Sequence, residues 1–525
     1  MTDESTSTAT FDYIIVGGGS AGATLAARLS KDANIRVLLL EAGRDFRSAD
    51  TPYHIQIPNP LRAIEDDAYR WPNLLARRTS AQEPRILWRG RAIGGSSTIN
   101  GQIAIRAIPD DFTRWEALGC AGWGWADVLP YFCKLEDDVD FGSEVYHGIG
   151  GPIPVHRAPV ADWGHVDRAL MQAGMALGYG WGDDHNAPTG TGVSPYAINS
   201  RNNRRVSTND GYLEPARGRK NLTIIGEALV EGLTFEGNRN RATGVTAVID
   251  GQRRAFRAEQ ETILAAGAIH SPAILQRSGI GPGDLLRGLG IPVLADRPVG
   301  RHLLDHPIVA INLTLRAEAR ATTLTHRHTN CCLRYGSGLE GGSDNDMIMI
   351  AGNLRAHEDG DFDLGRIGVS VYDSYSVGEV AITSPEATID PRVDERMLSD
   401  ARDFARIRDG VERLVAMGKT DALKDISHSI EYGYSGMSIT DNISAQELDD
   451  WIMAECSDAQ HAIGTCRMGP KEAPESVVDP ECRVIGAEGL RVIDASIMAD
   501  NVRANTHLTT VMIAEKMADR LLGRN

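Results

Sequence analysis

The fold of this chain is decided near its start, where residues 11–22 read Phe11-Asp12-Tyr13-Ile14-Ile15-Val16-Gly17-Gly18-Gly19-Ser20-Ala21-Gly22. The β-rich run up to Val16 predicts a buried strand, and the glycines after it predict a tight turn. Residues 23–29 have helical spacing, and residues 35–40 form a second apolar strand that ends at Glu41. The order strand, glycine turn, helix, strand and acid is the fingerprint of a dinucleotide-binding unit.

Each part of this unit has a physical reason. Gly17 permits the tight turn, Gly19 lets the backbone approach a pyrophosphate, and Gly22 allows close packing of helix on strand. The helix N-terminus offers free N–H groups to the phosphates, and the Ser20 hydroxyl adds a contact. Glu41 is placed to accept hydrogen bonds from a ribose diol, and an acid here favours FAD or NAD over NADP.

The same residues also fit a second pattern. Residues 18–22 spell G-x-S-x-G, the nucleophile elbow of α/β-hydrolases, which likewise lies between a strand and a helix. An elbow at the start of the sequence, with an acid ending the next strand, fits a hydrolase poorly. We interpret Ser20 as a phosphate contact and keep the nucleophile as the alternative.

The whole-chain properties indicate a globular protein. The 525 residues are 42% hydrophobic and 24% charged, and this length suggests roughly two to four compact units. The net charge of −17 argues against nucleic acid or an anionic membrane as the main partner. The sequence shows neither a membrane span nor a secretion signal. Its seven scattered cysteines include no C-x-x-C pair, so we expect a cytoplasmic location and no metal site.

A second glycine-rich loop and several later segments carry a family resemblance. The loop predicts a cradle in which backbone N–H groups approach a ligand. Together with the first motif, these segments resemble the signatures of the glucose–methanol–choline (GMC) flavoprotein oxidoreductases, in the family's order, from residue 11 to about residue 520. The matching segments are Gly90-Arg91-Ala92-Ile93-Gly94-Gly95-Ser96-Ser97-Thr98-Ile99-Asn100-Gly101, residues 267–272, 278–282 and 299–307, His461-Ala462-Ile463-Gly464-Thr465-Cys466-Arg467-Met468-Gly469, residues 490–496, and Asn505-Thr506-His507.

The resemblance implies a bound FAD. The pyrophosphate would lie on the first glycine turn, and Val230 would contact the adenine through its backbone. Some relatives attach FAD covalently through a histidine; the matching position here is Ile99, which has no nucleophile, so the resemblance implies non-covalent FAD. The cofactor-binding residues that it implies are Gly17, Gly19, Ser20, Ala21, Gly22, Glu41, Ala42, Arg91, Ala92, Gly95, Ser96, Asn100, Gly101, Val230, Ala266, Asp494, Ala495, Asn505 and Thr506.

The resemblance also selects two histidines. Alcohol oxidation requires that the hydroxyl proton be removed while a hydride leaves the carbon for the flavin, and a neutral imidazole suits the proton step. Among fourteen histidines, His461 and His507 match the family's two active-site positions. By this resemblance His461 would be the general base, and His507 would hydrogen-bond the substrate oxygen. In the alternative, one imidazole only orients the other.

The expected fold class is α/β, with a doubly wound, Rossmann-like FAD-binding domain and a discontinuous α+β substrate domain that contains an antiparallel sheet. We expect residues 1–155, 215–310 and 455–525 in the first domain. Residues 156–214 and 311–454 would form the second, cover the flavin and select the substrate.

The expected function is oxidation of a primary alcohol to an aldehyde, with hydride transfer to the flavin and reoxidation by O2 to give hydrogen peroxide. The sequence around residues 71–74 and 115–154 looks most like bacterial members that oxidise small aromatic or heteroaromatic alcohols, such as hydroxymethylfurfural and pyridoxine. The alternatives are a choline-type dehydrogenase with a non-oxygen acceptor and a hydroxynitrile lyase that keeps FAD without using its redox chemistry. The oligomeric state is left open.

Four other features are interpreted as non-functional. The acidic stretch that begins at Asp359 lacks the glycine that a calcium loop has at its sixth position, and Ser370 stands where the loop has glutamate at its twelfth. Asn312 begins a glycosylation sequon. Cys466 is expected to pack, as are the two tryptophans at 123 and 125.

Overall fold

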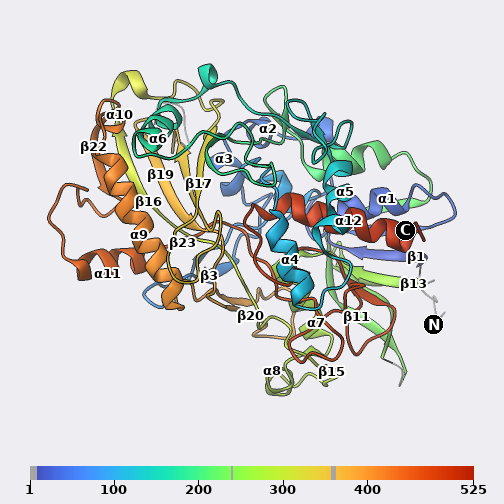
Figure 1. Cartoon of the computed structure of the whole chain (residues 1–525). Helices are drawn as coiled ribbons and strands as arrows, with labels where there is room; N and C mark the ends of the chain where they lie inside the picture. Colours follow the sequence, from blue (N-terminus) through green and yellow to red (C-terminus); the bar gives the residue numbers. More distant parts are fainter. Residues whose placement is uncertain (1–8, 238–239, 356–361, 525) are drawn as a thin grey trace.

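The computed structural model describes residues 9–237, 240–355 and 362–524. The calcium-loop pattern that begins at Asp359 therefore lies outside the described residues. Two large sheets lie side by side, one at each end of the molecule (Figure 1).

The first sheet is built from the dinucleotide unit. Its strands lie in the order β10-β2-β1-β13-β12-β11, with β24 also paired to β13. The pairs on the β10 side of β13, and the β13–β24 pair, are parallel, and β11 and β12 add an antiparallel extension. The strands are β1 (Ala9–Val16), β2 (Val37–Leu40), β10 (Leu222–Ile225), β11 (Ala228–Glu236), β12 (Arg241–Ile249), β13 (Gln252–Leu264) and β24 (Leu490–Val492).

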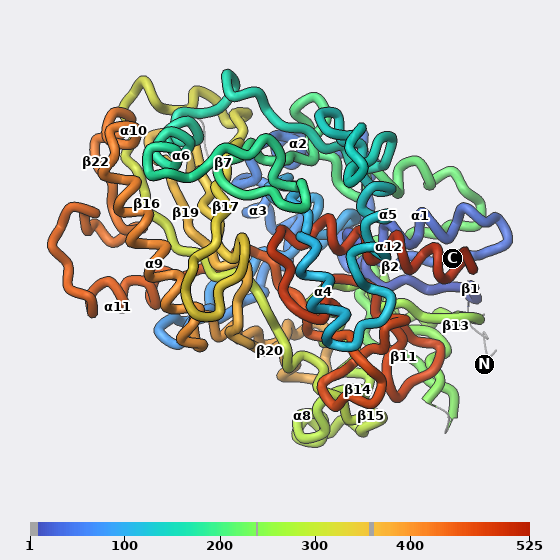
Figure 2. The backbone as a smooth tube through the Cα atoms, in the orientation of Figure 1, coloured from blue at the N-terminus to red at the C-terminus, as the bar shows by residue number. Residues whose placement is uncertain are grey.

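Two helices from opposite ends of the chain cover one side of this sheet. α1 (Ser20–Leu29) and α12 (Thr506–Leu521) run next to each other, blue beside red, in Figure 2. Arg28 on α1 forms ion pairs with Glu515 and Asp519 on α12. The last helix is thereby held against the first glycine turn.

The second sheet is antiparallel throughout, in the order β22-β16-β19-β18-β17-β7, with β23 paired to β16. Its side chains alternate between two faces. On β16, Val309, Ile311 and Leu313 join an apolar core with α6 (His165–Ala176) and α9 (Ala401–Gly418). The strands are β7 (Gly192–Pro195), β16 (Pro307–Leu315), β17 (Cys331–Tyr335), β18 (Met347–Gly352), β19 (Leu364–Val371), β22 (Ser427–Tyr432) and β23 (Ser457–Asp458).

The remaining strands and helices lie outside the two large sheets. The smaller strands are β3 (Leu75–Arg77), β4 (Arg85–Ile86), β5 (Glu136–Asp138), β6 (Ile153–Val155), β8 (Ser200–Arg201), β9 (Arg204–Arg205), β14 (Ile280–Gly281), β15 (Ala295–Asp296), β20 (Glu379–Ala381) and β21 (Arg392–Asp394). The other α-helices are α2 (Tyr53–Gln56), α3 (Leu61–Glu65), α4 (Pro109–Ala117), α5 (Trp125–Leu135), α7 (Gly267–Arg277), α8 (Gly283–Gly288), α10 (Asp421–Lys424) and α11 (Ala445–Glu455). Among the described residues, no helix combines the length and apolar character needed to cross a membrane.

This arrangement confirms the predicted α/β fold class with a separate antiparallel sheet. The division into two discontinuous domains stays a proposal, and two features bear on its boundaries. The proposed boundary at 310 falls inside β16, which is one strand from Pro307 and also pairs with β23. In addition, β3 pairs with β21, so residues 75–77 join a small sheet with a part of the chain assigned to the other domain.

Candidate active site

A cavity of about 880 Å³ lies between the two sheets. It is lined by the first glycine turn, the second glycine loop, the start of α12 and one face of the antiparallel sheet. Most of the residues predicted to bind the cofactor or to act in catalysis line this one cavity: Gly17, Gly19, Ser20, Ala21, Glu41, Ala42, Gly95, Ser96, Asn100, Gly101, Val230, Ala266, His461, Asp494, Ala495, Asn505, Thr506 and His507.

Three predicted residues do not line it. A Cβ on Gly22 would lie 1.9 Å from the Gly17 carbonyl oxygen, so Gly22 serves the packing of α1 on the turn. The Arg91 guanidinium carbon lies 5.0 Å from the ring centre of Trp71. Ala92 is fully buried in a small apolar cluster. The side chains of Arg91 and Ala92 therefore pack on the side of the second loop that faces away from the cavity and support its conformation.

The two glycine loops meet where a side chain would block the cavity. Gly17 has φ +101°, and a Cβ there would lie 2.6 Å from the Ala265 carbonyl oxygen. Gly95 has φ +54°, and its Cβ would lie 2.6 Å from the Gly19 Cα. Because glycine alone tolerates both the backbone angles and the contacts, the wall here is bare backbone beside the N-terminus of α1. This cradle, in a cavity long enough to run from Val230 to His461, fits a dinucleotide cofactor.

Glu41 lies in the wall with its carboxylate already held by the backbone. One oxygen accepts a hydrogen bond from the Gly18 N–H (2.7 Å) and the other from the Gly43 N–H (2.8 Å). Burial raises the pKa of Glu41 to about 7. Each carboxylate oxygen can accept a further bond, so the orientation suits a diol.

His461 is held on both ring nitrogens. Its Nδ1 lies 2.9 Å from Nδ1 of His306, and the Asn505 amide nitrogen lies 2.8 Å from its Nε2. If the amide donates to Nε2, the proton of His461 is on Nδ1 and points to His306. Burial, followed by the neighbouring His306, lowers the pKa of His461 well below its ordinary value. The ring is therefore neutral near pH 7, with a lone pair on Nε2.

His507 is the second residue of α12. Its Nδ1 lies 3.0 Å from the Ser20 hydroxyl, and its Nε2 has no hydrogen-bond partner among the described residues. Burial lowers the pKa of His507 to about 4. A serine beside a histidine is also found in the active sites of hydrolases. A serine triad further requires a carboxylate that orients the imidazole, and no described residue supplies one to His507.

The sequence prediction did not assign roles to two further residues beside His461. Tyr372 stacks on His306 with ring centres 4.4 Å apart, and its buried hydroxyl lines the cavity with no partner in the described part of the chain. The Asp305 carboxylate accepts the backbone N–H groups of His306 (2.7 Å) and His461 (2.9 Å). Asp305 and His306 belong to the 299–307 segment, which indicated the family but not their role. Tyr372 has no motif that could have identified it.

A buried acidic group adjoins Asp305. Asp305, Glu395 and Asp458 place carboxylate oxygens close enough to hold a metal ion. Arg78 already contacts two of them, with Nε 2.8 Å from Asp458 and 3.7 Å from Glu395. Burial, then Asp458, raises the pKa of Asp305 to about 7. The Arg78 guanidinium therefore already supplies positive charge to this acidic group.

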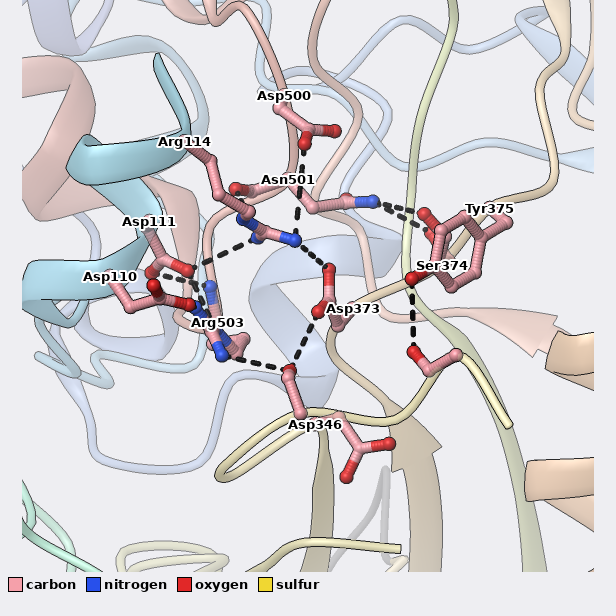
Figure 3. A network of polar contacts seen from close by, with 12 residues as sticks. Asp110, Asp111, Arg114, Asp346, Asp373, Ser374, Tyr375, Asp500, Asn501 and Arg503 are labelled. Carbon is pink, nitrogen blue, oxygen red and sulfur yellow. Dashed lines mark hydrogen bonds and ion pairs between the residues drawn. The ribbon is translucent and has the colours of Figure 1, made fainter. Parts of the chain in front are cut away.

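A network of ion pairs fixes the loop that leads to Asn505 and His507 (Figure 3). Arg503 is 1% exposed, and its Nε donates to Asp111 at 2.7 Å, with Asp110 on the same guanidinium. Arg114 donates to Asp373 at 2.6 Å and lies 3.3 Å from Asp111. We call these five residues the clamp.

Asn501 and Ser374 connect the loop before α12 to the segment before β16. Asn501, next to the clamp, donates to the Ser374 hydroxyl at 3.2 Å (Figure 3). Ser374 in turn donates to the Asp305 carbonyl oxygen at 2.9 Å. The loop before α12 and the segment before β16 are thereby held relative to each other.

Comparison with known proteins identifies the family. Models described as GMC oxidoreductase match residues 11–308 and residues 374–514. The chain is 37% identical over 532 residues to 5-(hydroxymethyl)furfural oxidase from Methylovorus sp. (strain MP688), covering 98% of both chains. It is 34% identical over 557 residues to oxygen-dependent choline dehydrogenase from Pectobacterium carotovorum, covering 98% of this chain and 95% of that one. The crystal structure of pyridoxine 4-oxidase from Mesorbium loti superposes with a TM-score of 0.88 at 32% identity, covering 98% and 100% of the two chains.

The chain therefore belongs to the GMC oxidoreductase family. Members of this family bind FAD, and the glycine cradle fits that cofactor. The protein is an FAD-dependent oxidoreductase that acts on alcohols.

Proposed function

We propose that this enzyme oxidises a small aromatic or heteroaromatic primary alcohol to the aldehyde and passes the electrons to O2, giving hydrogen peroxide. The observation that carries the proposal is that two neutral imidazoles, His461 and His507, line the same cavity as the glycine cradle. The 37% identity to 5-(hydroxymethyl)furfural oxidase and the 32% identity to pyridoxine 4-oxidase support this substrate class.

In this proposal the protein's own residues carry the proton step. His461 accepts the substrate's hydroxyl proton on Nε2, the nitrogen now facing Asn505, while its Nδ1–H stays on His306. His507 donates from its unpartnered Nε2 to the same substrate oxygen, because the Ser20 hydroxyl can accommodate either state of Nδ1. Bound FAD supplies the acceptor for the hydride from the carbinol carbon.

The cofactor contacts and its attachment belong to the same proposal. Ser20 and the bare backbone of Gly17, Gly19 and Gly95 would hold the pyrophosphate, and Glu41 the adenosine ribose. Ile99 lines the cavity and offers no nucleophile, which supports non-covalent binding. Acid precipitation should release all the flavin into the supernatant, whereas flavin retained by the protein would contradict non-covalent attachment.

The proposed activity is tested with purified holoenzyme and four alcohols at equal concentration: benzyl alcohol, hydroxymethylfurfural, pyridoxine and choline. Oxygen uptake, aldehyde and peroxide are measured together. We expect equal amounts of aldehyde and peroxide from an aromatic alcohol. Turnover that needs an added dye would favour a dehydrogenase, and cyanide release from mandelonitrile without alcohol turnover would favour a lyase.

A further inference from the structure

The antiparallel sheet presents an alternating row of side chains to the cavity. Ile308, Ala310 and Asn312 on β16 line it, as do Ile350 on β18 and Arg366 on β19. The residues between them point into the apolar core on the other face. The cavity face of the sheet is therefore apolar next to His306 and becomes polar and cationic farther along the strands.

Two arginines at that outer part have no partner among the residues that the structure describes. Arg355 and Arg366 both line the cavity. Nε of Arg355 is buried without a hydrogen-bond partner. Within the described ranges, which omit residues 356–361, neither arginine forms an ion pair or a side-chain hydrogen bond. Burial, and then the nearby charge of Arg355, lowers the pKa of Arg366 to about 10. Glu455 also lines the cavity and is the acid that acts on Arg366, yet the two form no ion pair. The guanidinium of Arg366 remains charged at neutral pH and unpaired.

Several other charged groups in the same wall have protein partners. Asp494 accepts from the Gly267 N–H at 2.8 Å and from two serines, and Arg78 is paired with Asp458. Arg277 donates to the Glu231 carbonyl oxygen at 3.1 Å. A desolvated guanidinium without a partner is costly unless a ligand supplies one. The two arginines thus mark a place where no carboxylate of the described residues pairs with the guanidinium groups.

We propose that the outer cavity binds the carboxylate of an anionic alcohol substrate on Arg366 and Arg355. This proposal rests on the proposed function and narrows its substrate to arylmethyl alcohols that carry a carboxylate across the ring from the hydroxymethyl group. A guanidinium presents paired donors that match a planar carboxylate. The same two charges disfavour choline, whose own charge is positive.

The spacing along the sheet suits such a molecule. Ile308 follows the His306–Pro307 corner beside His461, and Arg366 lies opposite Asn312 in the ladder. Ile308 and Asn312 are four residues apart, about 13 Å along a strand. The long Arg366 side chain can extend over part of that distance. The length that is left matches the length of one aromatic ring with its substituents.

An acidic protein needs such a feature to accept an anionic substrate. The chain carries a net charge of −17, which repels anions over most of its surface. Cations concentrated in a low-dielectric cavity counter that repulsion where the substrate binds.

The test compares two alcohols of nearly the same shape, 4-(hydroxymethyl)benzoate and 4-(hydroxymethyl)benzamide, with the wild-type holoenzyme and with Arg366→Met, Arg355→Met and Arg366→Lys. We expect the wild type to favour the carboxylate over the amide in kcat/KM by at least about tenfold. Each methionine variant should reduce that ratio, Arg366→Met to near one, and Arg366→Lys should retain part of it. Arg287→Met on the exposed helix α8, which removes the same charge far from this sheet face, should leave the ratio unchanged.

The outcomes separate this inference from the proposed function. Oxidation of the amide at least as fast as of the carboxylate, with equal losses for both in Arg366→Met, would overturn the carboxylate site while leaving alcohol oxidation in place. If neither alcohol is oxidised by the wild type but hydroxymethylfurfural is, the carboxylate site is likewise refuted. Oxidation of none of the three would refute the proposed function itself. Flavin content and thermal midpoint, measured on every variant, identify any that fail to fold.

Discussion

In the clamp, Arg503 donates to Asp110 and Asp111, and Arg114 contacts Asp111 and Asp373, so every charge has a partner (Figure 3). In the cavity wall, Arg366, the Tyr372 hydroxyl and Nε2 of His507 have none among the described residues. Both regions are buried and rich in polar groups. The difference indicates that the clamp serves the fold, whereas the cavity wall leaves its polar atoms available for a cofactor and a substrate. Changes in the two regions should therefore affect different observables.

The largest expected effect is on turnover, from His461→Ala in the cavity wall. Loss of the general base should lower kcat by about 10²–10⁴-fold. The unfolding midpoint should change little, because the imidazole contacts only His306 and Asn505 through its ring nitrogens. Steady-state oxidation of the best alcohol measures the loss. The exposed His165, replaced by Ala, is the matched control, and equal turnover in the two variants would remove His461 from the proton step.

The next effect is on stability, from Arg503→Leu in the clamp. This change removes the shorter of the two guanidinium contacts to the buried Asp111, leaving only Arg114 at 3.3 Å, and we expect it to cost about 3–5 kcal/mol of unfolding free energy. Denaturant unfolding measures it. Arg287→Leu, whose ion pair with Asp284 is exposed, should cost less than about 1 kcal/mol. If Arg503→Leu also lowered the unfolding free energy by less than about 1 kcal/mol, the clamp would contribute no more to stability than a surface ion pair does.

A third prediction concerns the acid side of the pH profile. Burial lowers the pKa of both His461 and His507, the latter to about 4, so both imidazoles stay neutral well below the ordinary imidazole value. The neutral base is the active form, and kcat/KM should therefore hold constant as pH falls and decline only below about 6.5. A decline centred at or above pH 7 would show that a partner charge, absent from the described wall, raises one of these pKa values in the working enzyme.

The smallest expected effect is on stability, from a change in the cavity wall. Arg366→Leu removes a partly buried charge that has no partner among the described residues, so the free energy of unfolding should stay the same or rise by about 1 kcal/mol. Urea unfolding beside Arg503→Leu gives the contrast directly. A loss above about 2 kcal/mol would mean that Arg366 has a structural partner.

The parts of the fold and site that the sequence predicted are those that depend on local chemistry. The strand–glycine–helix unit needs its residues at fixed spacing, and it appears as β1, the Gly17 turn and α1. The family segments also predicted that His461 and His507 would matter, and the structure brings both to one cavity. Their individual roles stay predictions.

The rest depends on contacts between distant parts of the chain. Arg114 and Asp373, 259 residues apart, meet because the fold brings α4 next to the segment that follows β19. Tyr372 and Arg366 lie on or next to a strand whose cavity face is set by the register of β19 against β16, which a sequence pattern does not specify. The same holds for the pairing of β3 with β21.

The central claim is that this cavity holds FAD and delivers an alcohol to it beside His461. The most direct measurement is the visible spectrum of the purified protein, recorded without oxygen while an arylmethyl alcohol is added. We predict that the flavin bands bleach and that air restores them. A protein that carries flavin which no alcohol bleaches, or one purified without flavin, would contradict the account.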